Sequence, residues 1–199
     1  MILITAALKA ELLPLIEYYK AKPRGNWADG RLFVSEKIHL LRTGVGMNKA
    51  RHTLSAYLDK YQPEKIINTG TAGALNPRFT IGLMTEPEII YNEKKQIIKP
   101  HPLYEDQYLL KQSKLLSVTA PVINQEQKNK LLKDFDADMV DMEAFAIAYL
   151  AGQRNIKFHC VKIISDFAND QTADDFKNNY KIIIEKLSGY LIKYLEASR

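Results

Sequence analysis

Short, continuous runs of apolar residues recur along this chain, and helical patterns separate them. The first run, residues 1–7, is followed directly by apolar positions at helical spacing over residues 8–19. A run that is apolar at every position is typical of a strand buried on both faces, and the strands of parallel sheets are usually covered by helices on both faces. The alternation of such strands with helices predicts an α/β fold.

The remaining elements follow the same alternation. Further strands are predicted at residues 31–35, 38–42, 65–69, 83–91, 95–99, 115–119, 137–142 and 158–164, and helices at about 48–61, 125–133 and 143–152. Small residues at 43–46 and 70–73 predict tight loops, and the polar segment 100–112 predicts a surface loop. Apolar residues at helical spacing from Phe176 to Leu195 predict a long last helix, and Thr172 with Asp175 resembles a capping box before it.

No linker, internal repeat or low-complexity segment interrupts this order. We therefore expect a single domain over residues 1–199. It is expected to have three α/β/α layers around a central mixed, mostly parallel sheet.

Composition and patterning limit the class of protein. The 199 residues are 46% hydrophobic and 26% charged, an ordinary globular balance that allows a sizeable core. No apolar run approaches the roughly 20 residues that span a bilayer. The first run has no basic leader and is soon followed by Glu11, so a buried strand is expected there and not a signal peptide. Cys160 is the only cysteine, so no disulfide framework or cysteine metal motif is expected, which favours a reducing cytoplasm.

The formal net charge of +5 raises the question of nucleic-acid binding. The lysines are scattered, however, with a modest run only at Lys128, Lys130 and Lys133. A nucleic-acid binder more often shows a dense basic stripe or a motif with interleaved aromatic residues. We interpret the charge as solvated surface and expect no nucleic-acid partner and no membrane partner.

Small residues and carboxylates follow the predicted buried strands. Ligands of open α/β sheets bind at the carboxyl ends of strands, and the residues found there are Glu11, Thr43, Gly44, Thr71, Ala72, Gly73, Asp141, Met142, Glu143, Ser165 and Asp166. Each has a structural interpretation, because turns need glycine and helix N-termini favour carboxylates. Together they predict a site for a neutral, hydroxyl-rich ligand.

The stretches that carry these residues resemble a known family. They lie in order along nearly the whole chain, at residues 5–11, 43–46, 68–75, 140–148 and 161–168. The Asp-Met-Glu-Ala sequence at 141–144 and the Ile-Ser-Asp sequence at 164–166 are the most specific. The set resembles the nucleoside phosphorylase/nucleosidase superfamily, and within it most closely the 5′-methylthioadenosine/S-adenosylhomocysteine nucleosidases.

The resemblance implies hydrolysis of the N-glycosidic bond of a purine nucleoside, with adenine favoured as the base. Asp166 matches the acid that protonates the purine N7, and Glu11 matches the general base that activates water. Glu143 matches the acceptor of the ribose hydroxyls, with Met142 packed on the sugar. The expected substrate-binding set is completed by Thr43, Gly44, Thr71, Ala72, Gly73, Asp141, Lys162 and Ser165. The resemblance implies no metal and no organic cofactor.

Three positions depart from the family pattern. Lys162 stands where these nucleosidases usually carry an arginine, so a point charge replaces a planar fork. Residues 118–124 lack the aromatic residue that commonly stacks on the base, and Ala173 falls about where an aromatic residue often covers the 5′ substituent. These departures leave the identity of the 5′ group open. Family members usually form homodimers, and Pro102, Leu103 and Tyr104 are candidate lid residues here.

Three functions remain in competition. A phosphorylase would need cationic and backbone donors, which Arg42 and residues 43–46 can supply, but Glu11 would repel phosphate, so hydrolysis is favoured. Nucleosidases for futalosine-type or adenosyl-hopane substrates are alternatives within hydrolysis. A binding protein without catalysis is the third, and the presence of both Glu11 and Asp166 weighs against it.

Overall fold

The computed structural model describes residues 1–104 and 110–197. Within these ranges the elements are, in chain order, β1 (Ile2–Ala6), α1 (Lys9–Tyr18), β2 (Lys22–Trp27), β3 (Gly30–Val34), β4 (Ile38–Arg42), α2 (Met47–Leu58), β5 (Lys65–Ala74), β6 (Met84–Asn92), β7 (Ile97–Ile98), β8 (Lys111–Ser117), α3 (Gln125–Asp134), β9 (Met139–Asp141), α4 (Ala144–Gln153), β10 (Lys157–Asp166) and α5 (Thr172–Ala197).

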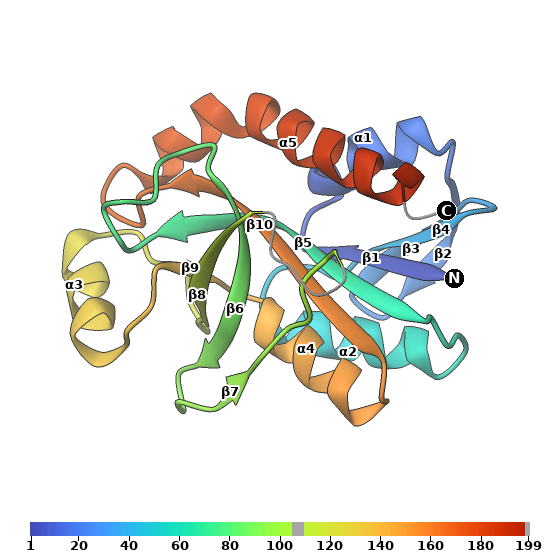
Figure 1. The fold of residues 1–199 in the computed structure, drawn as a ribbon, viewed down its shortest axis with the longest axis horizontal. Coiled ribbons are helices and arrows are strands. Elements are labelled where there is room, and N and C mark those ends of the chain that lie inside the picture. The colour runs from blue at the N-terminus through green and yellow to red at the C-terminus, as the bar shows by residue number, and fades with distance from the viewer. Residues whose placement is uncertain (105–109, 198–199) are drawn as a thin grey trace.

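Helices cover both faces of the sheet. Figure 1 shows α1 and α5 on one face and α2 and α4 on the other. Because successive residues of a strand point to opposite faces, β1 contributes to two separate cores. Ile4 packs in a cluster with residues of α1 and α5, whereas Leu3 packs in a cluster with residues of α2 and α4. The expected three-layer α/β/α fold is confirmed.

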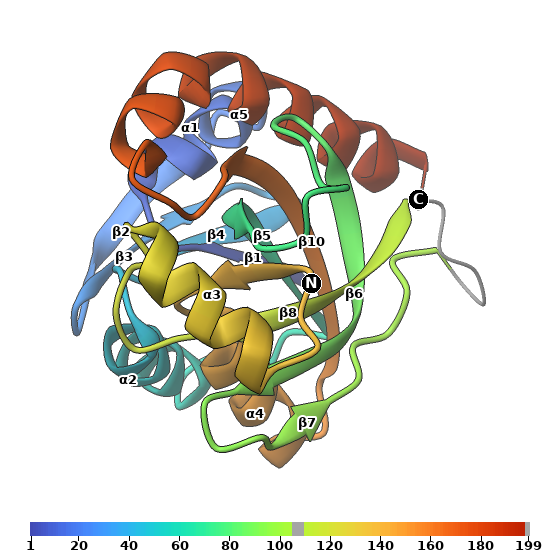
Figure 2. The ribbon, with the colours of Figure 1, turned by 90° about the vertical axis from the view of Figure 1, so that its left-hand side faces the viewer.

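The sheet is mixed and has a parallel centre. β4, β1, β5 and β10 are parallel neighbours in that order, and β3 and β2 extend the β4 edge in antiparallel fashion. On the other side β10 pairs with β6, β6 with β8, β8 with β9, and β9 returns to β5. This half of the sheet therefore closes on itself as a small barrel, seen end-on in Figure 2. Closure gives β5 three neighbours, β1, β10 and β9, and makes its carboxyl end part of the wall of the ring.

One local prediction, at the end of β5, is wrong, and one strand, β2, was not predicted. The loop predicted at residues 70–73 is a continuation of β5, because pairing with β10 supplies backbone partners as far as Gly73. The strand continues through Gly70, whose backbone has φ +131°, a value that residues other than glycine rarely adopt. β2 was not predicted because it is an almost fully exposed edge strand that has no apolar pattern.

Two predictions around the last helix and the loop before β8 also need correction. The hydroxyl of Thr172 donates to the carboxylate of Asp166, and the Asp175 N–H bonds to Gln171 O, so the predicted capping box is wrong. The hydroxyl oxygen of Thr172 accepts the Asn169 N–H at 2.9 Å, in place of the Asp175 N–H that a capping box requires. Of the loop predicted at 100–112, residues 111–112 belong to β8, and residues 105–109 lie outside the described residues.

The long helix α5 carries the predicted apolar stripe. Ile183, Ile184, Leu187, Leu191 and Leu195 are all buried, while residues on its other side are exposed. Within residues 1–104 and 110–197, neither α5 nor another helix has the length and apolar character needed to cross a bilayer.

Candidate active site

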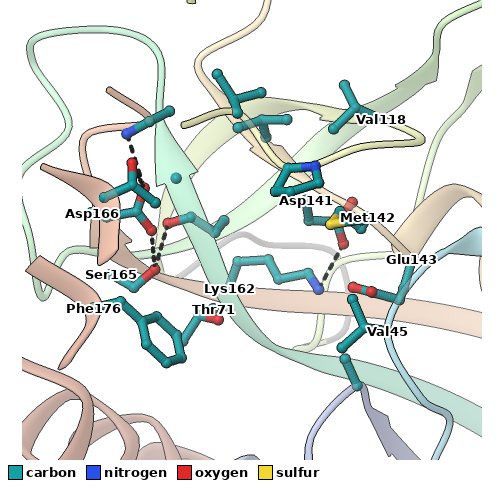
Figure 3. Close-up of a pocket in the computed structure, with 18 of the residues that line it drawn as sticks. Val45, Thr71, Val118, Asp141, Met142, Glu143, Lys162, Ser165, Asp166 and Phe176 are labelled. Atoms are coloured by element: carbon teal, nitrogen blue, oxygen red, sulfur yellow. Dashed lines mark hydrogen bonds and ion pairs between the residues drawn. The ribbon is translucent and has the colours of Figure 1, made fainter. Parts of the chain in front are cut away.

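A cavity of about 220 Å³ opens where β1, β5, β9 and β10 end. Figure 3 shows Asp166 and Ser165 at one end and Asp141, Met142, Glu143 and the Lys162 ammonium at the other. Its full lining is Ala7, Leu8, Glu11, Val45, Thr69, Thr71, Ala72, Gly73, Val118, Pro121, Val122, Val140, Asp141, Met142, Glu143, Lys162, Ser165, Asp166, Ala168, Thr172 and Phe176.

All the sequence-predicted site residues line this cavity except Thr43 and Gly44. Thr43 is fully buried, and its N–H and hydroxyl both donate to Ala6 O, so it ties the ends of β4 and β1 together. Gly44 donates its N–H to Ala7 O. The 43–46 loop reaches the cavity one residue later, through the side chain of Val45 and the N–H of Gly46.

Glu11 is held in the floor of the cavity by three donors. Its Oε2 accepts the Leu8 N–H at 2.9 Å, and its Oε1 accepts both the N–H and the hydroxyl of Thr71, at 2.9 and 3.0 Å. Only 4% of Glu11 is exposed. A Cβ on Gly70 would come within 2.8 Å of Glu11 Oε1, so glycine at position 70 makes room for the carboxylate. The carboxylate is therefore fixed, with one lone pair of Oε2 available.

Asp166 is held at the end of β10 by a different set of donors. Oδ1 accepts the Ala168 N–H at 2.9 Å and the Thr172 hydroxyl at 3.2 Å. Oδ2 accepts the Ser165 hydroxyl at 2.7 Å, which also lies 3.4 Å from Ala72 O. The two oxygens are thus inequivalent, and Oδ2 is the one with fewer donors.

Lys162 and Asp141 form a buried ion pair between β10 and β9. Lys162 Nζ lies 2.9 Å from Asp141 Oδ2, and their side chains are 3% and 1% exposed. Burial alone would lower the pKa of Lys162, but the adjacent Asp141 carboxylate raises it overall. Asp141 also accepts the Ser117 hydroxyl at 2.6 Å and the Ala144 N–H at the start of α4 at 3.0 Å. Such a pair is stable only when its remaining polar atoms are satisfied, as those of Asp141 are.

Glu143 is the least compensated carboxylate of the cavity. It is 7% exposed, and the Gly46 N–H donates to its Oε1 at 2.7 Å. Burial and the negative charge of Asp141 raise the pKa of Glu143 to about 7, against the opposing effect of Lys162. Its charge therefore changes near neutral pH, and a ligand hydroxyl that donates to it would favour the ionised form.

The apolar walls of the cavity were not predicted from the sequence. Val118, Pro121 and Val122 form one wall, and Phe176 of α5 is in the lining, whereas Ala173 is not. In the sequence Phe176 is the first residue of the apolar helical stripe, and the stripe alone does not show that its side chain faces a cavity. The same three wall residues also line a separate outer hollow of about 560 Å³ beside α3. Residues 118–122 therefore form a partition between two hollows.

The candidate lid residues Pro102, Leu103 and Tyr104 do not lie at the cavity of this chain. Leu103 is 3% exposed and packs in the core cluster beneath α5, and the ring of Tyr104 packs against that of Tyr194 at 5.1 Å. Pro102 O accepts a hydrogen bond from the ring of His159. None of the three lines the cavity of the same chain. In the described part of the chain, no group of three or more His, Cys, Asp or Glu side chains is arranged to hold a metal ion.

The fold and the cavity define a class of α/β protein: a mixed sheet is covered by helices on both faces, and carboxylates surround a cavity at the strand ends. Sequence comparison identifies the family within this class. The family profile described as Phosphorylase superfamily matches residues 1–92 and 93–196. The chain belongs to this superfamily, which confirms the resemblance found in the sequence.

Individual relatives narrow the comparison. A 5′-methylthioadenosine/S-adenosylhomocysteine nucleosidase of Staphylococcus epidermidis is 26% identical, over 89% of this chain and 91% of that protein. The crystal structure of the Helicobacter pylori enzyme of the same name, with butyl-thio-DADMe-Immucillin-A, matches with a TM-score of 0.88 at 17% identity, over 98% and 97% of the two chains. The native futalosine hydrolase of H. pylori matches with a TM-score of 0.87 at 17% identity, over 100% and 97%. These two structural matches show the fold.

Proposed function

We propose that this protein hydrolyses the N-glycosidic bond of a 5′-substituted adenosine, such as 5′-methylthioadenosine or S-adenosylhomocysteine, and releases the free base. One observation carries the proposal: Glu11 and Asp166 are two buried carboxylates that line the same cavity. Glu11 bonds to Thr71 of β5, and Asp166 Oδ1 lies near Gly73 of the same strand. A pair of carboxyl groups beside one cavity can supply the acid and the base that hydrolysis of a glycosidic bond by water requires.

The donor sets assign a role to each carboxylate. Asp166 Oδ2, with fewer donors than Oδ1, carries the proton that goes to purine N7, so that the base leaves neutral. Glu11 Oε2 takes a proton from the water that attacks the sugar, while its Oε1 stays bonded to Thr71. The developing positive charge on the sugar is stabilised by the carboxylates around it.

The remaining lining residues fit the sugar and the base. Glu143 Oε2 accepts a ribose hydroxyl while Oε1 keeps the Gly46 N–H, and Met142 packs on the ribose beside it. Val118, Pro121 and Val122 enclose the base, and Phe176 with Leu8 and Val45 faces the 5′ group. Because the wall proposed to enclose the base is aliphatic and lacks an aromatic ring for stacking, a futalosine-type nucleoside remains the alternative substrate. The buried Glu11 carboxylate disfavours a phosphate nucleophile at the same place.

The proposal is tested by assaying free base from 5′-methylthioadenosine, S-adenosylhomocysteine, adenosine, inosine and aminodeoxyfutalosine, each with and without phosphate. We expect release of adenine without phosphate. In Asp166→Asn we expect the turnover number to fall by about 10²- to 10⁴-fold with nucleoside binding retained, because the acid is lost and the shape is kept. Base release only with phosphate would contradict hydrolysis, and unchanged turnover in Asp166→Asn would contradict the role of Asp166.

We also propose that the protein acts in the cytoplasm as a homodimer. The single buried cysteine supports a reducing compartment, and the family resemblance supports the dimer. Light scattering coupled to gel filtration tests the oligomer, and a monomer that is fully active would contradict it.

A further inference from the structure

Lys128 joins a peripheral helix to the ends of two central strands. α3 contains no buried residue, and its first-turn side chains are exposed. Lys128 Nζ nevertheless reaches inward and donates to Phe167 O at 2.7 Å and to Ala74 O at 2.9 Å. Phe167 follows β10 directly, and Ala74 ends β5. One ammonium therefore bridges three elements beside the cavity.

The carbonyl that Lys128 holds belongs to the peptide group that also contacts Asp166. Phe167 O and Ala168 N lie in the same planar unit, and the Ala168 N–H donates to Asp166 Oδ1 at 2.9 Å. A cation on the carbonyl polarises the peptide and strengthens its N–H as a donor. Any rotation of this peptide changes both contacts together, so the position of the Lys128 ammonium and the orientation of the Asp166 carboxylate are linked.

The backbone at Ala168 has a conformation that is intrinsically unfavourable. Ala168 adopts φ +49°, a conformation that residues with a side chain seldom take. The residue is 1% exposed, so the unusual turn is buried against its neighbours. An orientation that the chain does not favour by itself must be maintained by outside contacts. The hydrogen bond from Lys128 to the preceding carbonyl is such a contact.

Electrostatics agree with this geometry. Burial lowers the pKa of Lys128, and the negative charge of Asp166 opposes that shift, which means that the ammonium and the carboxylate are close enough to interact. Lys128 does not line the cavity and so does not touch a bound nucleoside. Its influence on a reaction in the cavity therefore acts through Asp166, by way of the 167–168 peptide and of this direct attraction between the two charges.

We infer that Lys128 is a positioning residue for Asp166: by gripping Phe167 O it orients the Ala168 N–H that fixes Asp166 Oδ1, and so leaves Oδ2 facing the purine. The inference rests on the function proposed above and adds to it a residue outside the cavity. It predicts an effect on the turnover number and little effect on binding.

The test compares two variants on the same helix. Lys128→Met keeps the apolar stem and removes the ammonium, and Lys130→Met is the matched control, since Lys130 is exposed and lies outside the cavity. Turnover number and KM are measured with the preferred nucleoside, and folding is checked by thermal melting. Affinity is measured separately with 5′-methylthiotubercidin, in which a C–H replaces N7, so that its binding does not depend on proton transfer from Asp166.

A rescue experiment separates the ammonium from general packing. In Lys128→Cys, alkylation of the new thiol with bromoethylamine rebuilds a side chain of lysine length with an ammonium at its end. Cys160 is 3% exposed, and burial raises its pKa to about 12, so it does not compete for the reagent. Wild-type protein treated in the same way is the control.

We expect Lys128→Met to lower the turnover number by about tenfold or more, with inhibitor affinity and KM within about threefold of Lys130→Met, because a small misorientation of a catalytic group is costly. Alkylation should restore most of the lost turnover. Equal turnover in the two methionine variants, or parallel loss of turnover and inhibitor affinity without rescue, would overturn the inference. A wild-type protein that releases no base would instead overturn the proposed function.

Discussion

At the residue scale, four buried carboxylates share one cavity, and the three that are not paired with Lys162 have different surroundings. Glu11 accepts three hydrogen bonds, and Asp166 accepts three hydrogen bonds on two inequivalent oxygens. Glu143 accepts the Gly46 N–H and lies near the charge of Asp141, so its pKa rises to about 7. Carboxylates in different surroundings take different roles in one site. We therefore expect the protonation of Glu143 to make ligand binding depend on pH near neutrality.

The first prediction concerns this pH dependence. Under the proposed function, ribose hydroxyls donate to the ionised form of Glu143, so binding removes a proton from Glu143 below pH about 7. We expect the Kd of 5′-methylthiotubercidin to rise as pH falls below about 7, approaching tenfold per pH unit. Titration calorimetry between about pH 5 and pH 8 measures it. In Glu143→Gln, affinity should be weak and flat with pH. A 2′,3′-dideoxy analogue is the control, and an equal pH response from it would contradict the role of Glu143.

At the element scale, β5 sets the distance between the two proposed catalytic groups. Glycines at positions 70 and 73 let Glu11 and Asp166 lie directly on its backbone, where a Cβ would come within 2.8 and 2.9 Å of their oxygens. Because β5 is paired with β10 at both glycines and also with β9 at Gly73, it resists bending to make room. The positions of Gly70 and Gly73 on β5 therefore determine where the carboxylates of Glu11 and Asp166 can lie.

The second prediction follows from that contact. Gly73→Ala places a methyl group 2.9 Å from Asp166 Oδ1 and 3.1 Å from Ala168 Cβ, so the carboxylate must shift. We expect the turnover number to fall by about tenfold or more, since small misplacements of reacting groups are costly. The control is Gly189→Ala, inside α5, where a Cβ meets nothing within 4 Å. That variant should keep full activity and gain about 0.5–1 kcal/mol in stability. Equal activity of the two variants would contradict the prediction.

The sequence predicted the polar residues of the site better than its walls. Asp166 ends β10, Glu143 lies two residues after β9, and Glu11 lies in the first turn of the helix that follows β1. Because the apolar runs of β1 and β10 are visible in the sequence, the rim could be located without coordinates. Val118 and Pro121 lie in a loop without periodicity, where no pattern shows which side chains face inward. The closure of the barrel through β10 and β6 is a long-range pairing that local spacing does not encode.

At the scale of the whole molecule, two buried groups make opposite contributions to the pH dependence of stability. The pKa of Glu143 is raised from 4.5 to about 7, so the unfolded chain releases a proton first and stability falls as pH rises through this range. Burial lowers the pKa of His159 from 6.5 to about 4, so the unfolded chain binds a proton first as pH falls, and stability rises with pH. Glu86 is shifted in the same direction as Glu143, and His39 in the same direction as His159.

The third prediction is that single variants reveal the two slopes. Between pH 4.5 and 6.5 the contributions of Glu143 and His159 oppose each other in the wild-type protein. Relative to wild type, the unfolding free energy of Glu143→Gln should rise with pH, and that of His159→Gln should fall, each by up to about 1.4 kcal/mol per pH unit. Urea unfolding at several pH values measures the slopes. Parallel curves for wild type and both variants would show that neither group is shifted.

Residues 118–122, which form the partition between the two hollows, can change in evolution independently of the carboxylates in the cavity. The partition comes from a loop with a hollow on each side, whereas Glu11, Glu143 and Asp166 come from two helix starts and the end of a paired strand. Under the proposed function, exchanges among Val118, Pro121 and Val122 would change the space for the base, and the outer hollow would accommodate the change in volume. A lineage could then change the nucleoside that it accepts by small steps, each leaving the proposed catalytic carboxylates in place.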